Sequence, residues 1–333
     1  MTTDLHAPST GFSTRSVVAI GGGALLLASA IGMIVWWLAR TDELATLRGH
    51  EGAVRAVAAS SDGTVLASTG DDGTVRIWDA TTNRELHALA GNSGKIRAIA
   101  FGAGSIIAST GDDRTVRLWN WQTGSVTGTL SGAKKSLECL AISPDGQTVA
   151  AAGIEGIVYL WNAAKSATPK ALTGHAKHIH ALAFAPDGKT LISGGEDGNI
   201  RFWDYAAGAS LGNFPADHRH VFNLAVSSDG KVLAAAVSGK GVKRWSLPDR
   251  KELPALDGAG SVRAVAISPD NRTLGTVHED GLVKLWDAES GKLLSTLQGH
   301  KRVVLGIAFS PDGKTLATAG SDGTVKRWRV PAR

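Results

Sequence analysis

Short apolar runs separated by turn residues recur along most of this chain of 333 residues. In the stretch that ends at Trp203, such runs cover residues 179–184, 190–193 and 199–203, with Pro-Asp-Gly and Asp-Gly between them. Runs of this length between tight-turn residues are typical of strands joined by hairpins. A looser fourth run at residues 210–214 leads into the next copy, so the pattern predicts a unit of four strands.

The unit repeats with a nearly constant period. A tryptophan closes the third run of each copy, at Trp78, Trp119, Trp161, Trp203, Trp245, Trp286 and Trp328, and the intervals are 41 or 42 residues. A period in the forties indicates one supersecondary unit copied many times. One four-stranded sheet cannot bury both of its faces, whereas seven copies packed side by side can close into a ring. Pro254 falls in an expected fourth strand, which should then be the outermost, because proline is tolerated mainly at sheet edges.

These features resemble the WD-repeat β-propeller family over residues 43–330. The resemblance rests on Gly-His before the first strand, Asp-Gly in the second hairpin and Trp-Asp after the third strand, repeated along the chain. It implies an all-β fold, a seven-bladed propeller of four-stranded blades. It also implies a structural hydrogen-bond relay within each blade. Three copies have all four relay residues: His50, Ser68, Asp72 and Trp78; His175, Ser193, Asp197 and Trp203; and His300, Thr318, Asp322 and Trp328.

The other four copies depart from this relay. The second has Asn92 in place of histidine, and the sixth has no histidine at that place. The third and fifth have Ala151 and Ala235 in place of serine, and they also lack the aspartate, so we expect these two blades to be the least rigid. Because the Ser, His and Asp sets repeat at one structural position, packing explains them better than nucleophilic catalysis. We therefore expect that the protein is not an enzyme.

The last copy ends after three strands. The missing strand is found at the other end of the repeat region, where residues 42–50 match residues 292–300. We expect residues 43–47 to pair with the last blade as its outer strand and so to close a domain of residues 41–330. Closure would also remove an exposed sheet edge.

Residues 17–39 form a stretch of 23 residues without a charged side chain. A helix of this length spans roughly 30 Å of hydrocarbon, and Trp36 and Trp37 lie near one end, as interfacial residues do. We expect a flexible tail at residues 1–16 and a single transmembrane helix at residues 17–39. A cleaved signal peptide and a buried core helix are the alternatives. The flanking charges do not decide on which side of the membrane the propeller lies, because long domains translocate largely regardless of charge.

Composition narrows the function further. The net charge of +5 is mild, and the basic residues are scattered rather than clustered, so we expect no nucleic-acid partner. No glycine-rich phosphate loop and no CxxC or HExxH spacing occurs, so we expect no cofactor. The single cysteine, Cys139, lies in an apolar run and is expected to be a core residue rather than a nucleophile.

The side chains that differ between copies indicate where a partner would bind. In related propellers, partners commonly dock on the face formed by the loops before the first strands and by the second hairpins. The resemblance implies a partner-binding rim of Arg55, Arg97, Glu138, His180, Phe222, Arg263 and Leu305. The alternative is a solvated rim without a function.

Histidines near this rim are the only candidates for a metal site. His178 and His180 are two residues apart on one strand and should project to the same side, and His218 and His220 repeat the spacing in the next copy. Imidazoles that converge could hold a transition metal, but exposed, unpaired histidines are commoner, so we predict no metal. The sequence thus favours a membrane-tethered protein–protein interaction scaffold without catalytic activity. The alternative is a small-ligand or metal-binding propeller that is accessory to an enzyme.

Overall fold

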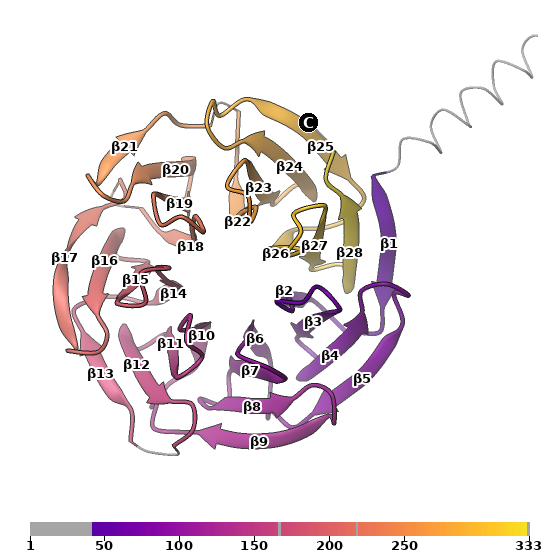
Figure 1. Cartoon of the computed structure of the whole chain (residues 1–333), viewed down its shortest axis with the longest axis horizontal. Coiled ribbons are helices and arrows are strands. Elements are labelled where there is room, and N and C mark those ends of the chain that lie inside the picture. The colour runs from indigo at the N-terminus through magenta and orange to yellow at the C-terminus, as the bar shows by residue number, and fades with distance from the viewer. Residues whose placement is uncertain (1–41, 166–167, 218, 257, 332–333) are drawn as a thin grey trace, which may run out of the picture. The chain divides into compact units, whose positions relative to one another are not determined.

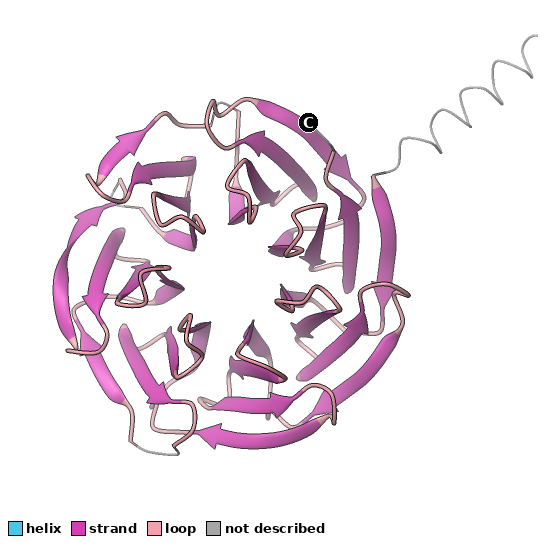
Figure 2. Ribbon diagram, in the orientation of Figure 1, coloured by secondary structure: helices cyan, strands magenta, loops and turns pink. Residues whose placement is uncertain are grey.

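A computed structural model describes residues 42–165, 168–217, 219–256 and 258–331. In these residues, 28 strands form seven antiparallel sheets of four strands each. The sheets stand around a central channel as the blades of a propeller (Figure 1, Figure 2). The all-β seven-bladed propeller expected from the repeats is therefore confirmed. The expected tail at residues 1–16 and transmembrane helix at residues 17–39 lie outside the described residues, and the part that is described holds no helix long and apolar enough to span a bilayer.

In six blades the first strand in the chain lies nearest the channel and the fourth lies outermost; in blade 7 the innermost strand is β26 and the outermost is β1. Blade 1 contains β2 (Val54–Ala59), β3 (Val65–Gly70), β4 (Thr74–Asp79) and β5 (Glu85–Ala90). Blade 2 contains β6 (Ile96–Phe101), β7 (Ile106–Gly111), β8 (Val116–Asn120) and β9 (Ser125–Leu130). Blade 3 contains β10 (Leu137–Ile142), β11 (Thr148–Gly153), β12 (Ile157–Asn162) and β13 (Lys170–Thr173). Blade 4 contains β14 (Ile179–Phe184), β15 (Thr190–Gly195), β16 (Asn199–Asp204) and β17 (Ala209–Pro215). Blade 5 contains β18 (Val221–Val226), β19 (Val232–Val237), β20 (Gly241–Ser246) and β21 (Lys251–Leu253). Blade 6 contains β22 (Val262–Ile267), β23 (Thr273–His278), β24 (Leu282–Asp287) and β25 (Leu293–Gln298). Blade 7 contains β26 (Val304–Phe309), β27 (Thr315–Gly320), β28 (Thr324–Arg329) and, as its outer strand, β1 (Glu43–Arg48).

The first hairpin of most blades is fixed by its own side chains. In blade 7, Asp312 Oδ1 accepts from the Ser310 hydroxyl at 2.6 Å and from the Lys314 backbone N–H at 3.0 Å. Gly313 follows with a φ of 68°, in the left-handed region that favours glycine in turns. Blade 2 is different, since residues 102–105 read Gly-Ala-Gly-Ser and the aspartate is missing.

The expected relay residues are hydrogen-bonded in blades 1, 4 and 7. In blade 1 the Trp78 indole N–H donates to Ser68 Oγ at 2.8 Å, and His50 Nε2 lies 2.8 Å from the same hydroxyl. His50 Nδ1 lies 2.8 Å from Asp72 Oδ2. Burial lowers the pKa of His50, and this outweighs the opposing effect of Asp72, so the imidazole is neutral at pH 7. It therefore donates to the aspartate and accepts from the serine.

Blade 2 completes the relay with a different residue, and blade 6 makes part of it. In blade 2 the Asn92 amide N–H donates to Asp113 at 2.9 Å, and its carbonyl oxygen accepts from Ser109 at 3.1 Å, so the amide replaces the imidazole. Blade 6 has no histidine before its first strand, as expected. There His278, on β23, contacts the Thr276 hydroxyl through Nε2 at 2.8 Å. An imidazole from another position in the blade thus contacts the relay hydroxyl, which also accepts from the Trp286 indole N–H at 2.9 Å.

Blades 3 and 5 lack the relay and make other buried hydrogen bonds. The Trp161 indole donates to the carbonyl oxygen of Ser131 at 2.9 Å in blade 3. In blade 5, Arg244 is only 1% exposed and donates to the carbonyl oxygens of Pro254 at 2.7 Å and of Ala288 in blade 6 at 2.6 Å. Pro254 directly follows β21, which ends at Leu253, so the expectation that it lies within the outer strand is wrong by one residue. A proline has no N–H to donate to the ladder, which ends there.

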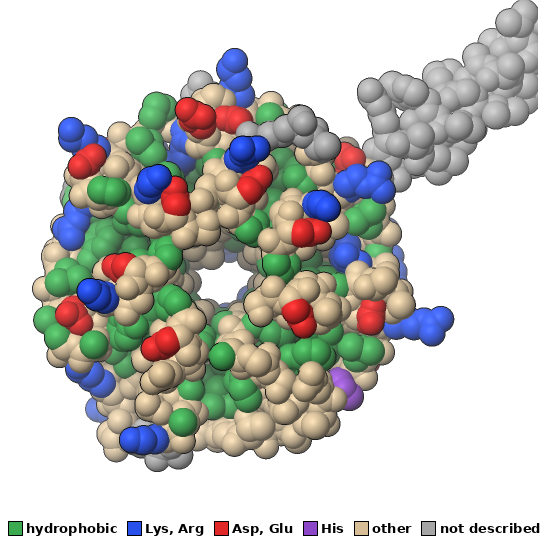
Figure 3. All heavy atoms as spheres, in the orientation of Figure 1, with side chains coloured by type: hydrophobic (Ala, Val, Ile, Leu, Met, Phe, Trp, Pro, Cys, Tyr) green, Lys and Arg blue, Asp and Glu red, His purple; other side chains and the backbone are tan. Residues whose placement is uncertain are grey.

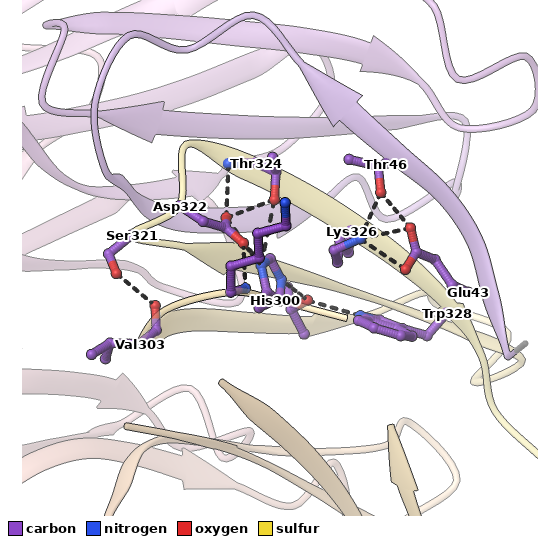
Figure 4. Close-up of polar contacts among 11 residues, drawn as sticks. Glu43, Thr46, His300, Val303, Ser321, Asp322, Thr324, Lys326 and Trp328 are labelled. Atoms are coloured by element: carbon purple, nitrogen blue, oxygen red, sulfur yellow. Dashed lines mark hydrogen bonds and ion pairs between the residues drawn. The ribbon is translucent and has the colours of Figure 1, made fainter. Parts of the chain in front are cut away.

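The ring closes where the two ends of the repeat region meet (Figure 4). β1 pairs antiparallel with β28, with Thr46 opposite Lys326 and Leu47 opposite Val325. Lys326 Nζ donates to both carboxylate oxygens of Glu43, at 2.7 and 2.8 Å, and to Thr46 Oγ1 at 2.7 Å. Burial opposes ionisation of Glu43, but the bonds from Lys326 and Thr46 outweigh it and hold its pKa below the usual value. The closing strand is therefore joined to blade 7 by both main-chain and charged contacts.

Replacement of Lys326 tests this closure. Lys326→Ala is expected to lower the free energy of unfolding by about 1–3 kcal/mol, because Glu43 and Thr46 lose their partner. Hydrogen–deuterium exchange followed by mass spectrometry should show reduced protection of β1 and β28. Lys243→Ala is the matched control, because Lys243 pairs with Glu252 at 2.9 Å at the same blade position, between strands that follow each other in the chain. Equal exchange in β1 for the two variants would contradict the role of Lys326.

The buried imidazole of blade 6 generates a pH prediction. Burial lowers the pKa of His278 to about 4, so the folded state keeps it neutral while an unfolded chain protonates it near 6.5. Its contribution to stability is complete above pH 6.5 and is lost as the pH falls from 6.5 to 4. The loss amounts to about 3 kcal/mol. Urea unfolding at pH 7.5 and 4.5 should therefore show a smaller loss for His278→Gln than for the natural chain; equal losses would contradict this prediction.

Candidate functional site

The seven predicted rim residues lie together at one mouth of the central channel, one from each blade. They line a single cavity of about 260 Å³. Figure 3 shows the channel as an opening through the middle of the ring. We call these seven residues the channel-mouth ring: Arg55, Arg97, Glu138, His180, Phe222, Arg263 and Leu305.

A recurring backbone irregularity positions these side chains. In blade 1 the pairing of β2 with β3 shifts between Val54 and Ala56, so Arg55 has no paired partner. The same shift occurs on the inner strand of the other six blades, always at the ring residue. A bulge redirects the side chain of its extra residue. The repeat pattern of the sequence indicated which residues form the ring. The bulge that directs their side chains into the channel mouth has no corresponding motif in the sequence.

Three arginines of the ring are held by carboxylates of their own second hairpins. Arg55 contacts Asp71 through Nε, and its Nη2 donates to the same carboxylate at 3.1 Å. Arg97 Nε donates to Asp112 at 2.9 Å. Burial opposes ionisation of both aspartates, but the arginine bonds outweigh it and lower their pKa. In blade 6, Arg263 lies 3.7 Å from Glu279. The basic sector of the ring is thus pre-oriented and nearly neutral in net charge.

Contacts across blades join ring residues to one another. His180 Nδ1 of blade 4 lies 2.9 Å from Glu138 Oε2 of blade 3. Burial tends to raise the pKa of Glu138, but the bond from His180 and the nearby charge of Arg97 outweigh this and lower it. Glu138 is therefore an ionised acceptor in the middle of the ring. Its position between Arg97 and His180 makes this sector polar.

Phe222 is the centre of an aromatic sector. The guanidinium of Arg263 lies 4.6 Å above its ring, a cation–π contact. The rings of His180 and His220 lie 6.3 and 6.2 Å from it. Phe222 is only partly buried, so its apolar surface and that of Leu305 remain accessible on either side of Arg263. The ring therefore offers charged, hydrogen-bonding and apolar contacts within one concave surface.

The candidate metal-binding histidines do not converge on one point. His180 pairs with Glu138, whereas His178 and His220 lie 3.8 and 3.7 Å from opposite oxygens of Glu196. In the part of the chain that the structure describes, no group of three or more His, Cys, Asp or Glu is placed to hold a metal ion. His218 lies outside the described residues. The geometry of the described residues gives the metal-binding alternative no support.

Cys139 has the environment of a core residue. It is 6% exposed, and its Sγ lies 3.4 Å from the carbonyl oxygen of Ala152 and 3.6 Å from that of Ile179 in the next blade. Burial raises its pKa, so the thiol is protonated at neutral pH. A protonated thiol is a poor nucleophile.

The family model described as WD domain, G-beta repeat matches six segments that together make up more than half of the chain. The matched segments are residues 41–79, 83–120, 124–162, 167–204, 250–287 and 291–329. The strands β18, β19 and β20 of blade 5 fall between the fourth and fifth segments. This is one of the two blades that lack the relay.

Two curated relatives show how short the similarity to individual proteins is. Ribosome biogenesis protein ERB1 of Chaetomium globosum is 50% identical over 46 residues, which are 14% of this chain and 6% of that protein. Small ribosomal subunit protein RACK1z of Arabidopsis thaliana is 46% identical over 56 residues, which are 17% of each chain. The matched stretches thus span only a small part of either relative and little more than one repeat.

Proposed function

The chain belongs to the WD-repeat β-propeller family, and on that premise we propose that it is a membrane-tethered scaffold that binds other proteins and has no catalytic activity of its own. The channel-mouth ring carries this proposal. Seven side chains of five types project from one repeated backbone position, and such variation on a repeated frame is what a surface that recognises a specific partner needs. The concave ring combines an aromatic residue with arginines, the residue types enriched among the energetically dominant contacts of protein interfaces.

The relatives support the fold rather than a particular partner. One is named as a ribosome biogenesis protein and the other as a protein of the small ribosomal subunit. Because each match extends over little more than one repeat, it reflects the strand and turn pattern that all repeats share. We therefore do not extend a ribosomal partner to this chain.

The proposed tether rests on residues 17–39. Their 23 uncharged residues are long enough to span a bilayer, with Trp36 and Trp37 near one end and Arg15 and Arg40 outside the run. A tether would confine the propeller to a membrane surface and raise its effective concentration for partners held at the same membrane.

Loss of two apolar ring residues tests the binding surface. In Phe222→Ala with Leu305→Ala, recovery of partner proteins from solubilised membranes should fall at least tenfold, while the melting temperature changes little because both side chains are partly exposed. Leu86→Ala with Leu294→Ala is the matched control, because these leucines are 44% and 47% exposed on outer strands. Quantitative mass spectrometry of the recovered proteins provides the measurement. Equal recovery with both double variants would remove the channel mouth as the binding surface.

The tether is tested by fractionation. The full chain should remain with membranes through high-salt and carbonate washes and be released by detergent. Leu25→Arg with Leu26→Arg places two charges in the apolar stretch and should release the protein to the soluble fraction. The circular dichroism spectrum of the released variant serves as the folding control. A full chain that high salt alone releases would refute a membrane-spanning tether.

A further inference from the structure

The seams between neighbouring blades are filled in different ways. At each seam, the residue two positions after the tryptophan of the later blade contributes to the filling or leaves it incomplete. Between blades 1 and 2 this residue is Trp121, and between blades 3 and 4 it is Tyr205; both pack on the apolar cluster of their seam. Tyr205 meets Phe184 edge to face, with 4.9 Å between the ring centroids. An aromatic side chain therefore fills each of these two seams.

An arginine fills two seams in which the same position holds alanine. Arg327 of blade 7 donates to the carbonyl oxygen of Ala80 in blade 1. Arg244 of blade 5 donates to the carbonyl oxygen of Ala288 in blade 6 at 2.6 Å. Each arginine directly precedes the tryptophan of its blade. The long side chain of the preceding blade thus reaches into the space beside the small alanine.

The seam between blades 2 and 3 has neither of these fillings. Ala163 occupies the position of the aromatic residue, and Leu118 occupies that of the arginine. The first hairpin of blade 2, at residues 102–105, is also made of small residues. A cavity of about 390 Å³ lies at this seam, which we call the seam pocket. Its apolar wall includes Ile106, Leu118, Ile142, Val149 and Ala163.

We propose that the seam pocket binds an uncharged aromatic side chain of a partner protein. The ligand should be uncharged because, among the described residues that line the pocket, none is charged and only Thr127 has a polar side chain. An ionised group would lose its hydration there without gaining a partner. The size of the cavity is within the range of small-ligand sites, about 300–1,000 Å³. The chain itself indicates the shape, because an indole and a phenol occupy the corresponding space at two other seams.

A second seam cavity provides an internal comparison. The cavity between blades 4 and 5 is about 250 Å³, and the Arg250 guanidinium lies 4.6 Å over the Phe202 ring in its wall. Arg250 also donates to the carbonyl oxygen of Leu211 at 3.3 Å. The chain's own cation therefore covers the aromatic wall of that cavity. No cation is among the described residues that line the seam pocket.

The seam pocket shares no residue with the channel-mouth ring. The two sites can therefore fail independently, and a partner that binds at the channel mouth gains a separate anchor at the seam. A buried aromatic anchor is the kind of contact that dominates the affinity of protein interfaces.

Isoleucine methyl groups report on the two seam cavities separately. Ile106 and Ile142 line the seam pocket, and Ile192 lines the cavity between blades 4 and 5. In the full chain with labelled isoleucine methyls, titration with N-acetyl-tryptophanamide should shift the Ile106 and Ile142 signals saturably and leave Ile192 unchanged. N-acetyl-leucinamide should require at least a tenfold higher concentration for the same shift.

A substitution that fills the seam pocket should abolish the methyl shifts caused by N-acetyl-tryptophanamide. Ala163→Trp places the indole of Trp121 at the equivalent seam position and should raise the melting temperature by about 2–4 °C while removing binding of the probe. Ile142→Phe, which copies Phe184, fills the pocket from the other side if the first variant fails to fold. Glu289→Trp is the control, because it adds an exposed tryptophan and leaves the pocket open.

Three results would overturn the proposal. The first is a titration without saturable shifts at Ile106 and Ile142, and the second is equal binding by the filled variants and the control. The third is binding of free indole without binding of N-acetyl-tryptophanamide, which would assign the pocket to a small molecule instead of a protein side chain.

Discussion

The pairing of β1 with β28 is the contact on which the rest of the structure depends. Each blade is a thin sheet whose faces are buried only by its neighbours, so an open ring would leave two faces exposed. Leu47 of β1 is 4% exposed and packs in one cluster with Val54 and Trp78 of blade 1 and Val325 of blade 7. The closing strand therefore completes one blade and covers the next. Because Lys326 and Glu43 are 283 residues apart in the chain, the contact carries a large loop-closure cost, which folded intervening blades reduce by bringing the two ends together.

The sequence predicted the architecture because its signals are local and repeated. The tryptophan period defined seven units, and Pro-Asp-Gly in three of them and Asp-Gly in the second hairpin of four marked the turns between strands. The strand at residues 43–47 could be assigned because its residues match those before the last copy. Its pairing with β28 places it where the repeat requires a fourth strand. Local chemistry was thus sufficient for the fold of the described residues.

Replacements within the repeat were less predictable, because they depend on geometry that several sequences can satisfy. Asn92 fills the imidazole's role at the expected position, whereas His278 contacts the relay threonine from a strand inside the blade. A relay needs a donor toward one neighbour and an acceptor toward the other, and the amide of Asn92 provides both. Arg244 is a larger departure, since a fully buried cation is satisfied there by backbone carbonyl groups. The family consensus therefore predicted fewer buried hydrogen bonds in these blades than the structure contains.

The departures from the repeat fall into two kinds, and the difference bears on function. Asn92 restores the relay of its blade, His278 contacts a relay hydroxyl, and Arg244 and Arg327 fill seams beside small alanines, so packing explains all four without a partner. The channel-mouth ring and the seam pocket replace no packing contact within or between blades. The ring varies at a position where a bulge directs the side chain out of its ladder, and the pocket leaves a seam unfilled that other blade pairs fill with an aromatic ring or an arginine. The unfilled seam forgoes stability that a buried ring would contribute, and the aromatic side chain proposed above would supply the missing contacts from outside the chain.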